Sequence, residues 1–211
     1  YSGRESMIIG TAGFTAALAI HRMEVNGQTP DKGPIVVTGA SGGVGSFAIN
    51  LLSKKGYDTV AVTSQSSMHD YLKKLGATEV KTLSDLALSD KPLAKGSYGG
   101  LIDSIGGETL SKLMASIDLW GNIACIGLAQ SPKLQATVIP LILRGVSLLG
   151  VSSTNCPMDL RTKLWNQFGK AMPLPDFDNI LSKEIALKDV SPYFDELIDN
   201  KHRGRLIVNC Q

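Results

Sequence analysis

The sequence has few cysteines, and those present are too widely spaced to build a disulfide framework or a thiolate metal site. Cys125, Cys156 and Cys210 form no Cys-x-x-Cys pair, and none stands near a histidine at ligand spacing. Such cysteine usage is typical of a reducing compartment, so we expect a cytoplasmic protein. Cys125 stands inside the apolar run NIACI, where we expect it to be an inert core residue.

The sequence also lacks a large charge of one sign and a long hydrophobic run. The formal net charge is only +2, and the lysines and arginines are scattered, which argues against nucleic acid or an anionic membrane as partner. The longest apolar stretches, residues 138–143 and 146–151, fall far short of a membrane span. No signal peptide opens the chain. Because Tyr1 is not an initiator Met and leads straight into a helical pattern, we expect a fragment of a longer protein.

What the sequence does contain is a regular alternation of predicted strands and helices. Short β-branched or apolar runs bounded by glycine predict strands, and longer segments with apolar residues at helical spacing predict helices. This alternation is typical of a parallel sheet covered on both faces, and it predicts a Rossmann-like α/β fold with a doubly wound sheet. The predicted strands are 34–38, 59–63, 79–82, 100–105, 122–126 and 147–151, and the predicted helices are 44–55, 67–75 and 107–117.

The two ends of the chain do not fit this alternation. Residues 7–24 predict a long apolar helix ahead of the first strand. Near the C-terminus we expect a strand at 184–187, a helix at 191–199 and a last strand at 206–209. That last strand comes after the main sheet is complete, so we expect its partner to lie outside this chain.

The first strand runs directly into a glycine-rich turn, residues 38–45, which read TGASGGVG. As a dinucleotide fingerprint, Ala40 takes the first small position, Gly42 the second and Gly45 the third. The first position makes a tight turn, the second lets the backbone approach a pyrophosphate, and the third lets the helix pack closely on the strand. The helix that follows points its free N–H groups at the phosphates. We therefore expect this segment to bind the pyrophosphate of a nicotinamide cofactor.

The end of the second strand indicates which cofactor is preferred. Enzymes that use NAD place Asp or Glu there to bind the ribose hydroxyls. This chain instead has the stretch TSQSS at 63–67, which is rich in hydroxyl and amide groups and contains no acid. Such a site can hydrogen-bond a 2′-phosphate. We therefore expect NADP(H), with NAD(H) as the alternative because no Arg stands in this stretch.

Several other segments accompany the glycine loop, and together with it they resemble the medium-chain dehydrogenase/reductase family. The resemblance is to the zinc-independent quinone oxidoreductase type, and within it to the acrylyl-CoA reductase branch. It covers nearly the whole chain. The segments that carry it are 9–16 (IGTAGFTA), 36–45 (VVTGASGGVG), 71–77 (YLKKLGA), 102–106 (IDSIG), 125–129 (CIGLA), 140–146 (PLILRGV) and the closing Gly204-Arg205.

The resemblance implies a division of the chain. Residues 1–175 would form the NAD(P)-binding Rossmann-like domain with its leading helix. Residues 176–211 would belong to a GroES-like catalytic domain that is mostly absent, with the last strands as its remnant. Because the substrate-facing residues of the family come largely from that domain, we expect this chain by itself to be inactive.

The resemblance also implies site residues. Ser41, Gly42, Gly43 and Val44 would lie on the pyrophosphate, beside Gly45. Thr63, Ser64 and Gln65 would line the 2′-phosphate site, where relatives often carry Arg or Lys in place of Gln65 and some carry Arg in place of Leu83. The nicotinamide half would be lined by Gly127, Leu141, Ser152 and Thr11.

The implied reaction is hydride transfer to a small-molecule substrate, either an activated alkene such as acrylyl-CoA or a quinone, and the implied assembly is a homodimer through strand 147–151. No catalytic proton donor can be named from the sequence, and His21, His69 and His202 stand too far apart to suggest a metal site. A non-catalytic NAD(P)-binding or redox-sensing module is the alternative. A short-chain dehydrogenase also opens on TGASG but needs Tyr-x-x-x-Lys, which Tyr71, Tyr98 and Tyr193 do not supply.

Overall fold

The computed structural model describes residues 1–86, 88–168, 170, 175–199 and 201–210. Its main sheet has six parallel strands in the order β3-β2-β1-β4-β5-β6, the doubly wound order that the sequence predicts. The pairing is in register, with Val36 of β1 between Val60 of β2 and Leu101 of β4. The strands are β1 (Ile35–Thr38), β2 (Thr59–Val62), β3 (Glu79–Lys81), β4 (Tyr98–Asp103), β5 (Ile117–Cys125) and β6 (Ser147–Gly150).

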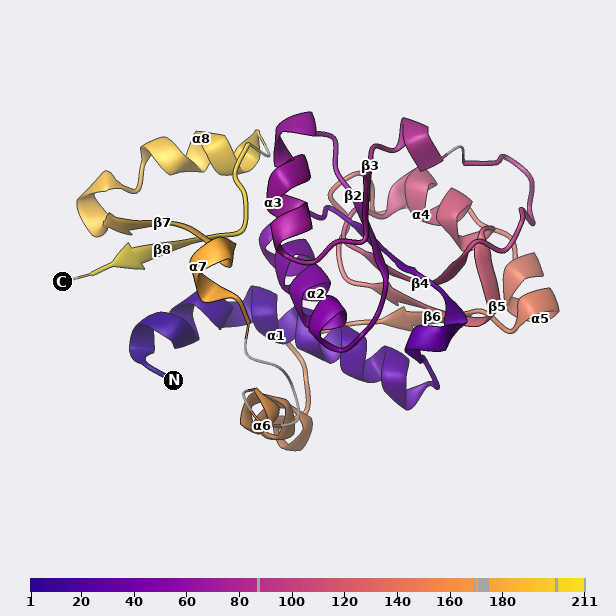
Figure 1. Ribbon diagram of the computed structural model, residues 1–211, viewed down its shortest axis with the longest axis horizontal. Helices are drawn as coiled ribbons and strands as arrows, with labels where there is room; N and C mark the ends of the chain where they lie inside the picture. Colours follow the sequence, from indigo (N-terminus) through magenta and orange to yellow (C-terminus); the bar gives the residue numbers. More distant parts are fainter. Residues whose placement is uncertain (87, 169, 171–174, 200, 211) are drawn as a thin grey trace.

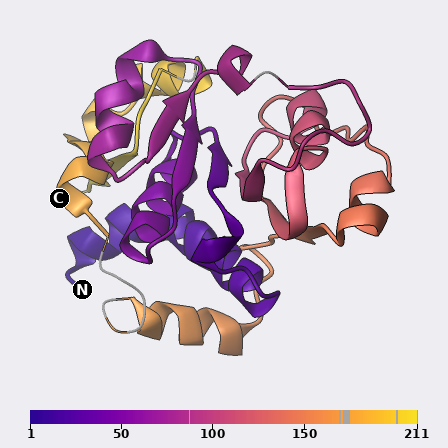
Figure 2. The same ribbon diagram turned by 45° about the vertical axis from the view of Figure 1, so that its right-hand side comes forward.

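The side chains of alternate strand residues pack into two separate hydrophobic cores, one on each face of the sheet. Val37 packs into the core beneath the first helices, whereas its neighbour Val36 packs into the core on the other face. The first face is covered by α1 (Gly3–Val25), α2 (Gly43–Lys54) and α3 (His69–Lys74), and the second by α4 (Gly107–Met114) and α5 (Ile139–Arg144) (Figure 1 and Figure 2). Both faces of the central strands are therefore covered, and β1, β2 and β4 are buried along nearly their whole length.

The leading helix begins earlier than its apolar pattern predicts. Ser2 caps it through a reciprocal pair of hydrogen bonds with Glu5, so α1 starts at Gly3 and not near Met7. Gly10 interrupts the helix with φ 46° and ψ −152°, a backbone conformation that glycine adopts without a steric penalty. The helix buries Phe14 and Ile20, among other apolar residues, against α2 and the sheet.

The expectation that the last strand has its partner outside the chain is wrong. β8 (Arg205–Asn209) pairs in parallel with β7 (Leu181–Ala186), and α8 (Pro192–Ile198) connects them as a crossover. Figure 1 shows this unit on the far side of α2 and α3 from the main sheet, on the same side as both chain termini. The sequence predicted both strands but not their pairing. Parallel strands are joined through a helix, so no tight-turn motif in the sequence indicates that the two strands are partners. Two further helices, α6 (Met158–Gln167) and α7 (Phe177–Ile180), complete the described chain.

The cysteines differ in exposure. Cys125 is only partly buried, because it lies at the carboxyl end of β5 and not in the middle of the strand. Cys156 is buried and Cys210 is exposed, and all three are free thiols. The expectation that Cys125 is a core residue is therefore too strong.

Candidate functional site

The glycine loop links β1 to α2 at the carboxyl edge of the sheet. Gly39 has φ +59°, and the N–H of Gly42 donates to its carbonyl oxygen over 3.1 Å, which closes the turn. A Cβ on Gly45 would lie 2.4 Å from that same oxygen, so only glycine allows α2 to pack this closely. No side chain caps α2 at its N-cap residue Gly42. The first N–H groups of the helix are therefore directed at whatever occupies the space before them.

That space is a cavity of about 620 Å³. It brings together the glycine loop and the end of β2, which are about 20 residues apart in the sequence. Of the residues that the sequence predicts as cofactor-binding, eight line it: Ser41, Gly42, Gly43, Val44, Gly45, Thr63, Ser64 and Gln65. Leu83 contributes an apolar part of the wall beyond the end of β2.

The other four predicted site residues do not line this cavity. Gly127 packs directly behind it, since a Cβ there would lie 2.3 Å from the carbonyl oxygen of Ser104, which does line it. Ser152 lines a different cavity, beside α1 and β6. Leu141 on α5 packs against the second core, and Thr11 is exposed on α1. The residues predicted for the pyrophosphate and the 2′-phosphate thus share one cavity, whereas those predicted for the nicotinamide half do not line it.

The wall between β1 and β4 is fixed by a buried carboxyl group. Asp103 is fully buried and accepts hydrogen bonds from the hydroxyl of Thr38 and the N–H of Gly106, each over 2.7 Å. Burial raises the pKa of the Asp103 carboxyl above its ordinary value, although these hydrogen bonds oppose the shift. Asp103 therefore holds the carboxyl ends of two strands together. The neighbouring Ser104 lines the cavity, and its Oγ is buried with no hydrogen-bond partner among the described residues.

A second chain of hydrogen bonds supports the loop from the outside. The hydroxyl of Tyr71 on α3 donates to Oγ of Ser46 over 2.8 Å. The Ser46 hydroxyl in turn donates to the carbonyl oxygen of Gly42 over 2.7 Å. Arg203 lies 4.7 Å from the centre of the Tyr71 ring. Burial raises the pKa of Tyr71, so its hydroxyl stays protonated and available as a donor at neutral pH.

Sequence reasoning missed the contribution of the C-terminal segment to this cavity. The N–H of Gly204 donates to the carbonyl oxygen of Ser41 over 2.8 Å, and Nε of Arg205 donates to the carbonyl oxygen of Ile8 over 3.1 Å. Burial lowers the pKa of the Arg205 guanidinium, and no carboxylate pairs with it among the described residues. The one signal in the sequence was the basic HRGR at 202–205. The segment lines the cavity with Leu197, His202, Gly204, Arg205 and Leu206.

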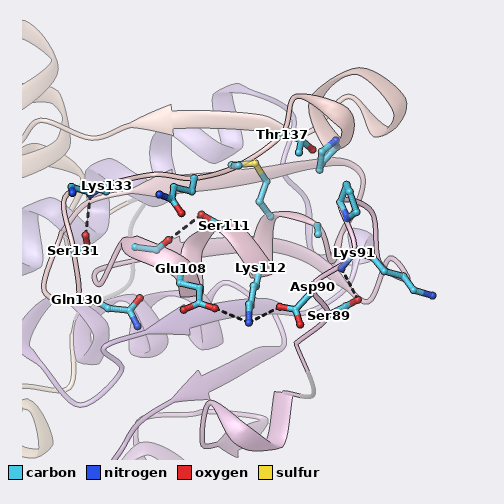
Figure 3. A pocket seen from close by; sticks show the side chains of 17 residues that line it. Ser89, Asp90, Lys91, Glu108, Ser111, Lys112, Gln130, Ser131, Lys133 and Thr137 are labelled. Atoms are coloured by element: carbon cyan, nitrogen blue, oxygen red, sulfur yellow. Dashed lines mark hydrogen bonds and ion pairs between the residues drawn. The ribbon is translucent and has the colours of Figure 1, made fainter.

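Two further cavities are less suited to a dinucleotide. One, of about 550 Å³, lies along α4, where Figure 3 shows Lys112 between Glu108 and Asp90. The Nζ atom of Lys112 is 2.8 Å and 2.7 Å from these two carboxylates, so its charge is already balanced. The other, of about 760 Å³, lies between α1 and β6 and is mostly apolar. Neither includes the glycine loop.

The three histidines lie on separate elements: His21 on α1, His69 at the start of α3 and His202 before β8. Within the described ranges, no three His, Cys, Asp or Glu side chains come together in a way that could hold a metal ion. None of the helices in the described part of the chain combines the length and apolar character that a bilayer span requires.

Comparison with known proteins gives one family and several close relatives. The profile of the family described as zinc-binding dehydrogenase matches residues 43–170. YhfP of Bacillus subtilis, whose name describes a quinone oxidoreductase, is 43% identical over 206 residues, which are 97% of this chain and 62% of YhfP. Acrylyl-CoA reductase AcuI of Ruegeria pomeroyi is 36% identical over 207 residues, which are 98% of this chain and 62% of that protein.

Solved structures show the same fold. The yhdH oxidoreductase of Salmonella enterica in complex with NADP matches with a TM-score of 0.95 at 42% identity, over 100% of this chain and 64% of that one. Bacillus subtilis yhfP with NAD bound matches with a TM-score of 0.92 at 43% identity, over 98% of this chain and 63% of that one. The chain thus spans less than two thirds of the length of these relatives.

Proposed function

This chain belongs to the zinc-binding dehydrogenase family, and we propose that it is the nucleotide-binding portion of an NADP(H)-dependent oxidoreductase. The observation that carries the proposal is the cavity at the carboxyl edge of the sheet, where the glycine loop, the start of α2 and the end of β2 meet. Two features of the chain fit a bound dinucleotide. The loop leaves backbone N–H groups of α2 uncapped, and Ser104 offers a buried hydroxyl that has no hydrogen-bond partner in the described part of the chain.

The lining of the cavity supports an assignment of residues to the parts of the cofactor. Ser41, Gly42, Gly43, Val44 and Gly45 hold the pyrophosphate through their backbone N–H groups, and the glycines among them let the backbone approach it without a Cβ in the way. Thr63, Ser64 and Gln65 bind the ribose and its 2′-phosphate through neutral hydrogen-bonding groups. The absence of an acid after β2 supports NADP(H) over NAD(H), although the two solved relatives bind NADP and NAD respectively.

The nicotinamide half lies beyond the cavity that this chain encloses. Gly127 abuts the wall at Ser104, and we propose that Thr11, Leu141 and Ser152 border the same half farther along the sheet edge. When bound, the nicotinamide supplies a hydride to the substrate. The relatives' names point to a small-molecule substrate, either acrylyl-CoA or a quinone.

We propose that two chains associate through β6. This strand is at the edge of the main sheet, and its side chains alternate between partly buried and exposed. An uncovered parallel edge presents unpaired backbone groups, which a second copy can satisfy. We also propose that residues 1–175 form the nucleotide-binding domain and that residues 176–211 belong to a GroES-like catalytic domain. We further propose that the protein works in the cytoplasm. The three free thiols support that compartment.

Isothermal titration of the chain with NADPH and with NADH tests the proposal. We expect both to bind, with NADPH the tighter, and we expect no turnover of acrylyl-CoA or quinones by this chain alone. If neither nucleotide binds to the folded chain, the proposal is wrong. If NADH binds more tightly, only the preference for NADP(H) is wrong. Oxidation of NADPH by the natural full-length protein in the presence of each substrate separates the two substrate classes.

A further inference from the structure

The end of β2 lacks a positive charge for a 2′-phosphate, and its neighbours on the sheet do not supply one. The stretch 63–67 contains only hydroxyl and amide side chains. Lys81, at the end of β3, has its Nζ 2.6 Å from a carboxylate oxygen of Glu79, and this ion pair raises the pKa of Lys81. Its charge is therefore already paired. A dianionic phosphate placed here needs a cation from another part of the chain.

The C-terminal segment brings a titratable base into the same cavity. His202, in the loop between α8 and β8, lines the cavity together with Ser64, Gln65 and Leu83, more than 100 residues away in the sequence. Nε2 of His202 lies 3.3 Å from Oγ of Ser182 on β7. That hydroxyl donates its proton to the carbonyl oxygen of Arg205 over 2.9 Å, so it accepts from the ring, and Nε2 carries the hydrogen. Nδ1 is left as the acceptor of the neutral ring, with no hydrogen-bond partner among the described residues.

We propose that His202 is the residue with which this chain recognises the 2′-phosphate of NADP(H), by taking a proton on Nδ1 and donating a hydrogen bond from the resulting N–H to a phosphate oxygen. The inference rests on the proposed nucleotide-binding function and deepens it. The hydrogen bond from Nε2 to Ser182 fixes the ring while Nδ1 gains or loses its proton. Selectivity for the phosphorylated cofactor then comes from a segment outside the main sheet, which explains why the end of β2 carries no Arg.

The surroundings of His202 favour the neutral ring in the absence of an anion, because on balance they lower its pKa. Burial lowers its pKa, Arg205 and Arg203 lower it further, and Glu196 on α8 raises it. Because the protonated ring pairs with the phosphate, binding must raise the pKa of His202, and the chain must take up a proton. NADPH affinity therefore gains from this pair as the pH falls from about 8 toward 6. NADH, which has no 2′-phosphate, does not share this gain.

The experiment measures binding of NADPH and NADH by calorimetry between pH 6 and pH 8, in phosphate-free buffers of different ionisation enthalpy. We expect NADPH, but not NADH, to bind with net proton uptake near neutral pH. His202→Gln keeps a donor toward Ser182 but cannot take a charge. It should weaken NADPH binding at pH 6 by about tenfold, which corresponds to a pKa rise of about one unit on binding, and should leave NADH unaffected.

Two further variants complete the test. His202→Lys carries a fixed charge and should keep the NADPH preference while losing its pH dependence. His21→Gln, on α1 and outside this cavity, is the matched control and should change nothing. The 2′-phosphate itself titrates with a pKa near 6. Affinities of different variants are therefore compared at the same pH, where the charge of the free phosphate is the same for all of them. NADPH affinity that is unchanged in His202→Gln overturns the inference and leaves the proposed function standing, whereas absence of binding by either nucleotide overturns both.

Discussion

The N–H of Gly204 donates to the carbonyl oxygen of Ser41 over 2.8 Å, and this single hydrogen bond joins the last strand to the glycine loop. Gly204 adopts φ +56°, and a Cβ at this position would lie 2.1 Å from the carbonyl oxygen of Ile180. The chain can therefore pass between the end of α7 and the loop only as glycine. As a consequence, a segment from the far end of the sequence forms one wall of the candidate nucleotide cavity.

Gly42→Asp should remove nucleotide binding without unfolding the chain. Gly42 is the N-cap of α2 with an extended backbone, a position that Asp favours, so the midpoint of thermal unfolding should stay the same or rise slightly. The carboxylate would face the pyrophosphate. Two like charges about 4 Å apart near a protein surface repel by about 4 kcal/mol, so NADPH affinity should fall by about 100-fold or more.

Gly42→Ser is the control for that change, because it adds a neutral cap at the same position. Calorimetry with NADPH should show affinity within about tenfold of the unmodified chain. Retained affinity in a folded Gly42→Asp variant would contradict the placement of the pyrophosphate at this loop.

Gly45→Ala should destabilise the chain by about 1–3 kcal/mol, the usual range for overpacking a close contact. The added methyl group would lie 2.4 Å from the carbonyl oxygen of Gly39 and 2.7 Å from Cα of Ala40, both of which are backbone atoms that cannot turn aside. Urea unfolding followed by circular dichroism measures the loss. Gly150→Ala is the control, since nothing lies within 4 Å of its added Cβ; equal stability of the two variants would rule out the packing role of Gly45.

Asp103→Asn should alter how stability depends on pH. Burial raises the pKa of Asp103 in the folded chain, so the stability that it contributes is fully present below its unfolded pKa and falls as the pH rises through the folded value. Asn does not titrate. The free energy of unfolding of the unmodified chain, measured relative to the variant, should therefore decrease between pH 4 and pH 7. A difference that increases over this range would show that the hydrogen bonds from Thr38 and Gly106 outweigh burial.

Leu148→Lys should weaken the proposed dimer. Leu148 is on the edge strand β6 and is 37% exposed, so a charge there meets its symmetry mate across the interface. Light scattering should detect a dimer of the unmodified chain and a shift toward monomer in the variant. Leu134→Lys changes a comparably exposed leucine in the loop between β5 and α5 and should leave the mass unchanged. A monomeric unmodified chain would contradict the proposal.

The sequence by itself determined the main sheet and the centre of the site. The β-branched runs, the glycine caps and the TGASGGVG turn predict the strands, the doubly wound order and the location of the glycine loop, because local propensity and the parallel crossover rule agree. The start of α1 was also present in the sequence as the Ser2–Glu5 capping pair, although the apolar pattern alone missed it.

Only the tertiary structure decided the pairing of β7 with β8 and the entry of His202 and Arg205 into the cavity. The paired residues of β7 and β8 are more than 20 positions apart, and His202 and Arg205 are more than 100 positions from the glycine loop, so no local preference of the chain records either contact. The buried hydrogen bonds of Asp103 likewise depend on the register between β1 and β4. The glycine loop could be found in the sequence because its constraint is a local steric one, whereas the cavity around it forms only when distant strands pack together.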